Sequence, residues 1–148
     1  MRRIRGFSLV ELMIVIAILA IMSAIAVFSW ARFTANSNLR AATADMEADL
    51  MLMKEKARSD TANSYSITFN LAANNYTMTG TGSKTPASFA PDIKITSVGG
   101  INSGSTTITF QKRGILSPGS IVLSNNRAST ATITYNITGR TYVTYAMQ

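Results

Sequence analysis

Apolar residues fill the first part of the chain almost without a break. From Phe7 to Ala31 the only ionisable side chain is Glu11. As an α-helix this segment would measure roughly 37 Å, which exceeds the hydrocarbon core of a bilayer at about 30 Å. The pattern therefore predicts a transmembrane helix over residues 7–31.

A different pattern follows in residues 32–60. Apolar residues recur there at steps of three and four, and charged residues fill other positions, which is typical of an amphipathic helix. We expect this helix to continue the apolar one and to pack its apolar face on a core, with a bend at Asn36–Asn38 left open. The apolar positions are Leu39, Ala42, Met46, Leu50, Met53 and Ala57.

Residues 61–148 alternate between apolar and polar side chains and are rich in Thr, Ile, Val and Tyr, which favours β-strands. Turn residues separate the runs, for example at Asn74–Asn75, Gly80–Ser83, Gly99–Gly100, Lys112–Gly114 and Asn125–Asn126. We expect an α+β fold in which the long N-terminal helix packs on an antiparallel β-sheet head. The predicted strands are SYSITFN, NYTMTG, DIKITSV, TTITFQ, SIVLS, ATITYN and RTYVTYA.

Composition excludes several classes of function. The chain has no Cys and no His, so a disulfide is excluded, and zinc sites or His-based catalysis are disfavoured. Lys and Arg number 14 against 7 Asp and Glu, but Arg2, Arg3 and Arg5 precede the apolar run, and without them the excess falls from seven to four. That is weak support for a nucleic-acid partner. We expect no enzyme, cofactor or metal site.

Glu11 is the feature that needs a reason. A carboxylate near the middle of a spanning helix costs about 2.5–3.5 kcal/mol, and somewhat less near its end. One interpretation is a secretory signal cleaved within Ser23–Ala26, and another is a plain single-span anchor. Both leave Glu11 without a role.

The segment RGFSLVEL, Arg5 to Leu12, resembles the class III signal of the type IV pilin superfamily. The resemblance implies that residues 1–6 form a leader which prepilin peptidase removes between Gly6 and Phe7, and that the new amine of Phe7 is N-methylated. It also implies that Glu11 pairs with the amine of a neighbouring subunit during assembly. The pair would offset much of the desolvation of both charges.

The chain departs from that family at Ala20 and Phe28, where many major pilins have Gly and Pro. We therefore expect the helix to stay continuous there. The three arginines before the apolar run place the N-terminus in the cytoplasm and the head outside the inner membrane, in the periplasm.

A second resemblance covers the last third of the chain, which is similar to minor pseudopilins of the GspH/FimT type at Phe110, Gly114, Gly139 and Arg140. It implies a structural subunit of a type IV pilus or a type II secretion pseudopilus. The implied partners are other pilin or pseudopilin subunits, prepilin peptidase, the inner-membrane assembly platform and, before assembly, membrane lipid.

An alternative function is DNA binding during DNA uptake. Some FimT-type proteins bind DNA through a closing G-R-x-R segment, and this chain has GRTY, with Tyr142 in place of the second arginine. Arg140, Lys112 and Arg113 would then contact DNA, and Tyr135, Tyr142 and Tyr145 would stack on bases. The competing interpretation is that these are solvated turn charges and tyrosines on the face of a sheet.

Overall fold

A single long helix begins the described part of the chain. The computed structural model describes residues 7–60, 62–86, 92–100 and 104–148, without the side chains of residues 25–28. Helix α1 runs from Leu9 to Ser59. It continues through Ala20 and Phe28, as predicted, and no break interrupts it at 36–38. The chain divides into two compact units, Met1–Thr34 and Ala35–Gln148, and the second is the head.

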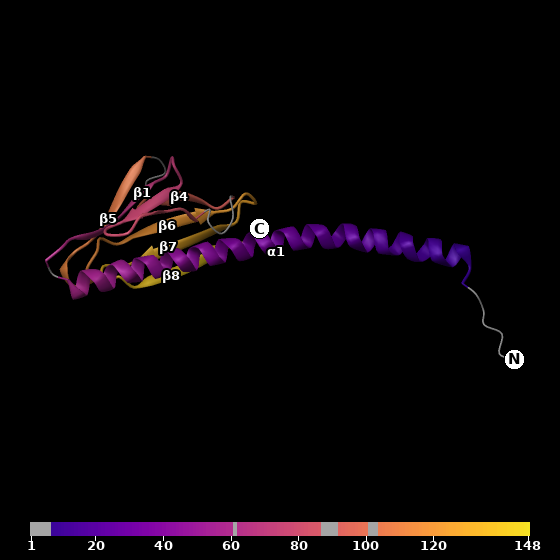
Figure 1. Ribbon diagram of the computed structural model, residues 1–148, viewed down its shortest axis with the longest axis horizontal. Helices are drawn as coiled ribbons and strands as arrows, with labels where there is room; N and C mark the ends of the chain where they lie inside the picture. Colours follow the sequence, from indigo (N-terminus) through magenta and orange to yellow (C-terminus); the bar gives the residue numbers. More distant parts are fainter. Residues whose placement is uncertain (1–6, 61, 87–91, 101–103) are drawn as a thin grey trace. The chain divides into compact units, whose positions relative to one another are not determined.

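Among the described residues, the strands of the head form two antiparallel sheets of four strands each. The predicted α+β fold of a helix on antiparallel strands is therefore confirmed (Figure 1). All seven predicted strands are present, and the two-residue strand β3, which was not predicted, begins at the last residue of the turn expected at Gly80–Ser83. The first sheet has the order β3-β2-β1-β5, with β1 Tyr65–Asn70, β2 Asn75–Met78, β3 Ser83–Lys84 and β5 Ser105–Phe110. The second has the order β4-β6-β7-β8, with β4 Lys94–Val98, β6 Gly119–Ser124, β7 Thr130–Tyr135 and β8 Thr141–Ala146.

Two hairpins of the same type connect β6 to β7 and β7 to β8. In the first, the N–H of Asn125 donates to the carbonyl of Ser129 at 3.1 Å, and in the second the N–H of Asn136 donates to the carbonyl of Arg140 at 3.0 Å. Each three-residue loop ends in a residue with positive φ, Ala128 at 61° and Gly139 at 67°. This is a common three-residue hairpin loop, and glycine suits its last position best.

The core lies between the second half of α1 and the inner faces of both sheets. All six predicted apolar positions of the amphipathic helix are buried, and Met46 and Met53 are 1% and 0% exposed. The sheets contribute aromatic and branched side chains from alternate positions, as the period of two predicts. Fully buried examples from the strands are Ile67, Phe69, Ile121, Leu123 and Ile133.

A buried carboxylate attaches α1 to the first sheet. Asp49 is 5% exposed, and it accepts hydrogen bonds from the Tyr76 hydroxyl at 2.7 Å and from Lys84 Nζ at 2.9 Å. Burial, together with the hydrogen bond to Asp49, raises the pKa of Tyr76 far above its ordinary value. The same carboxylate raises the pKa of Lys84. Both partners therefore stay protonated at neutral pH, as this arrangement requires.

Asn36 attaches the helix to the second sheet. Its Oδ1 accepts hydrogen bonds from Ser129 Oγ at 2.8 Å and from Asn125 Nδ2 at 3.2 Å. Its Nδ2 donates to the carbonyl of Gln148 at 3.5 Å. Asn36, in the stretch where the sequence left a bend of the helix open, thus contacts the residues that flank the β6–β7 loop and the last residue of the chain.

Candidate functional site: the first turn of helix α1 and a groove on the head

The predicted assembly residue, Glu11, lies in the first turn of α1. Its Oε2 accepts a hydrogen bond from the backbone N–H of Ser8, the residue before the helix, at 3.4 Å. Ser8 and Glu11 have the S-x-x-E spacing of a capping box, in which the glutamate satisfies a free N–H at the helix start. A carboxylate there also interacts favourably with the helix dipole. The spacing alone predicts this local role, which the expectations above did not include.

Phe7 lies in the same region and its side chain is 77% exposed. Gly6 and the rest of the predicted leader lie outside the described residues. Cleavage between Gly6 and Phe7 and N-methylation of Phe7 therefore stay predictions.

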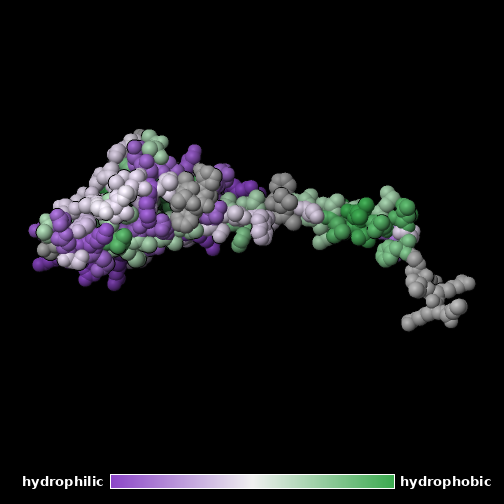
Figure 2. Space-filling view, viewed as in Figure 1, coloured by the Kyte–Doolittle hydropathy of each residue, from purple (hydrophilic) through white to green (hydrophobic). Residues whose placement is uncertain are grey.

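The first unit presents an apolar surface on all sides of the helix. The large apolar side chains between Leu9 and Met22 are all exposed, from 43% at Val15 to 74% at Leu9. Figure 2 shows these hydrophobic residues gathered along this part of α1, whereas hydrophilic residues cover much of the visible face of the head. Among the described residues this is the one helix long and apolar enough to cross a membrane. Such a surface is stable in lipid or against other helices.

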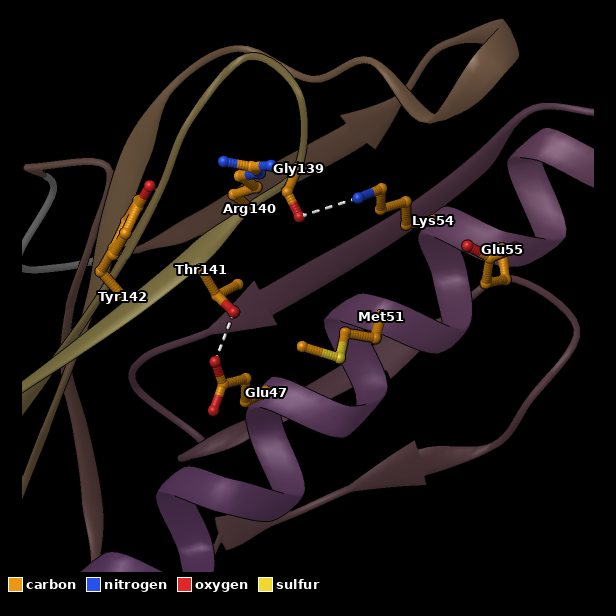
Figure 3. A pocket seen from close by; sticks show the side chains of 8 residues that line it. All are labelled: Glu47, Met51, Lys54, Glu55, Gly139, Arg140, Thr141 and Tyr142. Carbon is orange, nitrogen blue, oxygen red and sulfur yellow. Dashed lines mark hydrogen bonds between the residues drawn. The ribbon is translucent and has the colours of Figure 1, made fainter.

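The head carries a groove of about 480 Å³ between α1 and the start of β8 (Figure 3). Glu47 accepts a short hydrogen bond from the Thr141 hydroxyl, and Lys54 Nζ donates to the carbonyl of Gly139 at 3.2 Å. These two contacts join the flank of the helix to the first residue of β8 and to the loop before it. The groove is lined by Glu47, Met51, Lys54, Glu55, Gly139, Arg140, Thr141 and Tyr142.

Two of the positions that resemble the pseudopilins, Gly114 and Gly139, make room for Lys54. A Cβ on Gly114 would lie 2.9 Å from Lys54 Cγ, and a Cβ on Gly139 would lie 2.8 Å from Lys54 Cδ. Both glycines also have positive φ, which other residues adopt at a cost. The third matching position, Phe110, is buried in the core. These positions therefore have structural reasons in this chain.

The residues predicted to contact DNA lie on two segments of the head, the loop before β8 and the 3-10 helix η2. Arg140 is exposed beside the groove, where Glu47 and Glu55 place two carboxylates. Lys112 and Arg113 are exposed in the short 3-10 helix η2, Lys112–Gly114.

The expectation that three tyrosines stack on bases is wrong for Tyr135. This side chain is 4% exposed, and burial raises its pKa. The Tyr145 ring is already covered on one face by Arg40, whose Cζ lies 5.5 Å from the ring centroid. Tyr142, 57% exposed, is the most available of the three. DNA binding stays a prediction, and carboxylates beside Arg140 disfavour a polyanion there.

Residues 1–27 match the family model described as the prokaryotic N-terminal methylation motif. Neither the curated proteins nor the solved structures give a match to this chain. The motif is the leader of type IV pilins and covers the beginning of the apolar helix. It supports a type IV pilin-like protein that is processed by prepilin peptidase, is anchored in a membrane and assembles with other pilins. It also points to a structural protein and not to an enzyme.

Proposed function

We propose that this chain is a structural minor pilin or pseudopilin of the GspH/FimT type. Prepilin peptidase removes residues 1–6 in the inner membrane, leaving N-methylated Phe7 as the first residue. The processed subunit then leaves the bilayer and joins a type IV pilus or a type II secretion pseudopilus through the first half of α1.

The observation that carries this proposal is the all-round apolar surface of α1 with Glu11 as its only charge between Phe7 and Ala31. A helix that only anchors the protein gains nothing from a carboxylate in the bilayer. A helix that moves from lipid into a bundle of identical or similar helices gains a pairing partner for that carboxylate. The match of residues 1–27 to the methylation motif supports the same interpretation.

Glu11 has two possible partners, and they belong to different states. In the single subunit its carboxylate reaches the N–H of Ser8. In a bundle with a stagger of about one turn, it would meet the methylated amine of a neighbour's Phe7, which carries a full positive charge. The contact with Ser8 is long, at 3.4 Å, and only its acceptor is charged. In the contact with the amine both partners would be charged, so assembly would exchange the weaker contact for the stronger.

Two substitutions separate these roles. Glu11→Gln keeps an oxygen that can cap Ser8 but removes the charge, whereas Glu11→Val removes both. In cells that express the native assembly machinery, we expect both variants to insert into the inner membrane and to be processed. We expect both to be depleted at least tenfold from sheared filaments or cross-linked assemblies. Asp92→Asn, the same change from carboxylate to amide on the head but outside the residues that line the groove, serves as the control.

Mass spectrometry of the membrane-extracted protein gives an independent readout, namely whether N-methylated Phe7 is the first residue. A mature chain that begins near Val27 would establish a secretory signal instead. Incorporation of Glu11→Gln at the wild-type level would show that capping of the helix is all that Glu11 provides, and the pairing mechanism would be rejected.

A further inference from the structure

Strand β8 is one of the two edge strands of the second sheet, and its outer backbone groups can be identified from the hairpin that precedes it. The hydrogen bond from Asn136 to Arg140 fixes which residues of β8 pair with β7. In an antiparallel ladder, hydrogen-bonded pairs alternate with pairs whose N–H and C=O groups point the other way. Thr141, Val143 and Tyr145 therefore direct their N–H and C=O groups away from β7.

These outward groups have no partner in the part of the chain that the structure describes. Strand β8 pairs with β7 alone, and no hydrogen bond between described residues uses the backbone N–H or C=O of Thr141, Val143 or Tyr145. The three residues span about 14 Å along the strand. They present a row of donors and acceptors at the spacing of an incoming β-strand.

The edge also lacks the features that protect the edges formed by β3 and β4, as does β5, the remaining edge strand. Strand β3 has only two residues and includes Lys84, and β4 carries Lys94 and an irregular register between Ile95 and Ser97. Strand β8 has six residues in continuous register, TYVTYA, without charge or proline. Lysine, bulges and shortness are the usual means by which proteins prevent strand addition. Their absence leaves β8 open to it.

The groove of Figure 3 gives the incoming strand a place for its side chains. It lies between the first residues of β8 and the flank of α1, where Met51 is 50% exposed. Two acidic residues and two basic residues border it, so its net charge is balanced. An uncharged strand with an apolar side chain over Met51 fits this surface, because a charged strand would meet one repulsive pair for each attractive pair.

We propose that the outer edge of β8 is a docking site for an uncharged, extended segment of a partner polypeptide. The segment adds a fifth strand to the second sheet, hydrogen-bonded to Thr141, Val143 and Tyr145, with one face directed to the groove. This is recognition by β-strand addition, in which backbone groups supply the affinity and the groove supplies selectivity. The proposal does not depend on the proposed assembly through α1.

The test uses the full chain, labelled with ¹⁵N and held in detergent micelles, and a capped hexapeptide of alternating threonine and valine as the probe. At saturation we expect the amide exchange of Thr141, Val143 and Tyr145 to slow at least tenfold. The amides of Thr107 and Thr109, on β5, an edge strand that does not line this groove, should not change. A peptide of the same sequence that is N-methylated at every residue, and a peptide of alternating glutamate and lysine, should each bind at least tenfold more weakly.

A backbone substitution provides the second arm. Val143→Pro removes one outward N–H without removing a hydrogen bond to β7, and proline is tolerated at such edge positions. We expect it to raise the Kd for the peptide at least tenfold, whereas Val143→Ala, which loses side-chain volume only, should raise it less than threefold.

Unchanged affinity of Val143→Pro, equal binding of the N-methylated peptide, or equal protection of Thr107 would each overturn the proposal. If Val143→Pro does not fold, the N-methylated peptide still decides. Concentration-dependent protection of Val143 in the chain without peptide would identify a second copy as the occupant and would overturn the assignment to a different partner.

Discussion

The two halves of helix α1 are built from similar residues but meet different surroundings. Leu19, in the first half, is 56% exposed, whereas Leu50, in the second half, is 3% exposed. Both are leucines in a regular helix, so helix propensity does not distinguish them. The difference comes from their neighbours in the sequence, because apolar residues surround Leu19 on all sides and form a stripe at Leu50.

This difference shows how one helix serves two purposes. The apolar stripe of residues 35–59 is buried within the chain, because the two sheets cover it. The all-round apolar surface of residues 9–24 is exposed in the single chain and needs lipid or other helices. The second half therefore determines the stability of the head, and under the proposed function the first half determines where the subunit resides and what it joins.

The same substitution in each half tests this comparison most directly. Leu50→Ala should lower the free energy of unfolding of the head by about 2–5 kcal/mol, because it leaves a cavity in the core. Leu19→Ala should leave it unchanged within 0.5 kcal/mol, roughly the limit for an exposed site. Near-ultraviolet circular dichroism during thermal unfolding of the full chain in detergent measures this, since all five tyrosines lie beyond residue 60. A similar loss from both variants would contradict the division of roles.

Polar contacts of α1 should show the same contrast between buried and exposed positions. Asp49→Ala leaves the buried Tyr76 hydroxyl without its acceptor and Lys84 without its closest carboxylate, so we expect a loss of about 2–3 kcal/mol. Glu55→Ala removes a surface pair with Arg58 and should cost less than about 0.5 kcal/mol. Denaturant titrations of both variants measure the two losses. Equal values would mean that Asp49 contributes no more than a surface charge.

Much of the fold could be predicted from local patterns in the sequence. The steps of three and four identified Leu39 and Met53 as core residues, and alternation identified seven strands, because burial of one face leaves a period in the sequence. The division into two sheets could not be predicted in this way. It depends on which strand pairs with which. The alternation of apolar and polar residues is the same whether Ile67 and Ile121 lie in one sheet or in two.

The contacts of the candidate sites were harder to predict for a related reason. The position of Lys54 between Gly114 and Gly139 joins residues about 60 and 85 positions apart in the sequence, and no local pattern encodes such contacts. The buried position of Asp49 is similar, because an isolated aspartate on a helix usually faces water. By contrast, the link between Ser8 and Glu11 is local, and its spacing does predict it.

Alkaline pH should weaken the hydrogen bonds that the buried Asp49 accepts from Tyr76 and Lys84. Tyr76 and Lys84 both have raised pKa values in the folded head, so their contribution is fully present below their ordinary values of 10.0 and 10.5 and is lost as pH rises through the folded values. We expect the denaturant midpoint to fall above about pH 10. Tyr76→Phe should be less stable than the wild type at pH 7, but its stability should decrease less as the pH rises. Tyr142→Phe, at an exposed position, should follow the wild type, and the same slope in all three proteins would rule out Tyr76 as the titrating group.

The smallest effect concerns the two hairpins of the second sheet, which differ at one position. Gly139 ends the β7–β8 loop with φ of 67°, and Ala128 ends the β6–β7 loop with φ of 61°. Alanine in this conformation costs about 1–2 kcal/mol, part of which is offset because glycine has more freedom in the unfolded chain. Ala128→Gly should therefore stabilise the head by about 0.5–1 kcal/mol and raise its Tm by a few degrees.

Ala73→Gly, at an exposed turn position whose φ is not positive, should destabilise the head slightly by the same entropy argument. Because Ala128 lies in the loop whose flanking residues Asn125 and Ser129 bind Asn36, a loss of stability in Ala128→Gly would show that this contact to α1 depends on a rigid loop and outweighs the backbone strain.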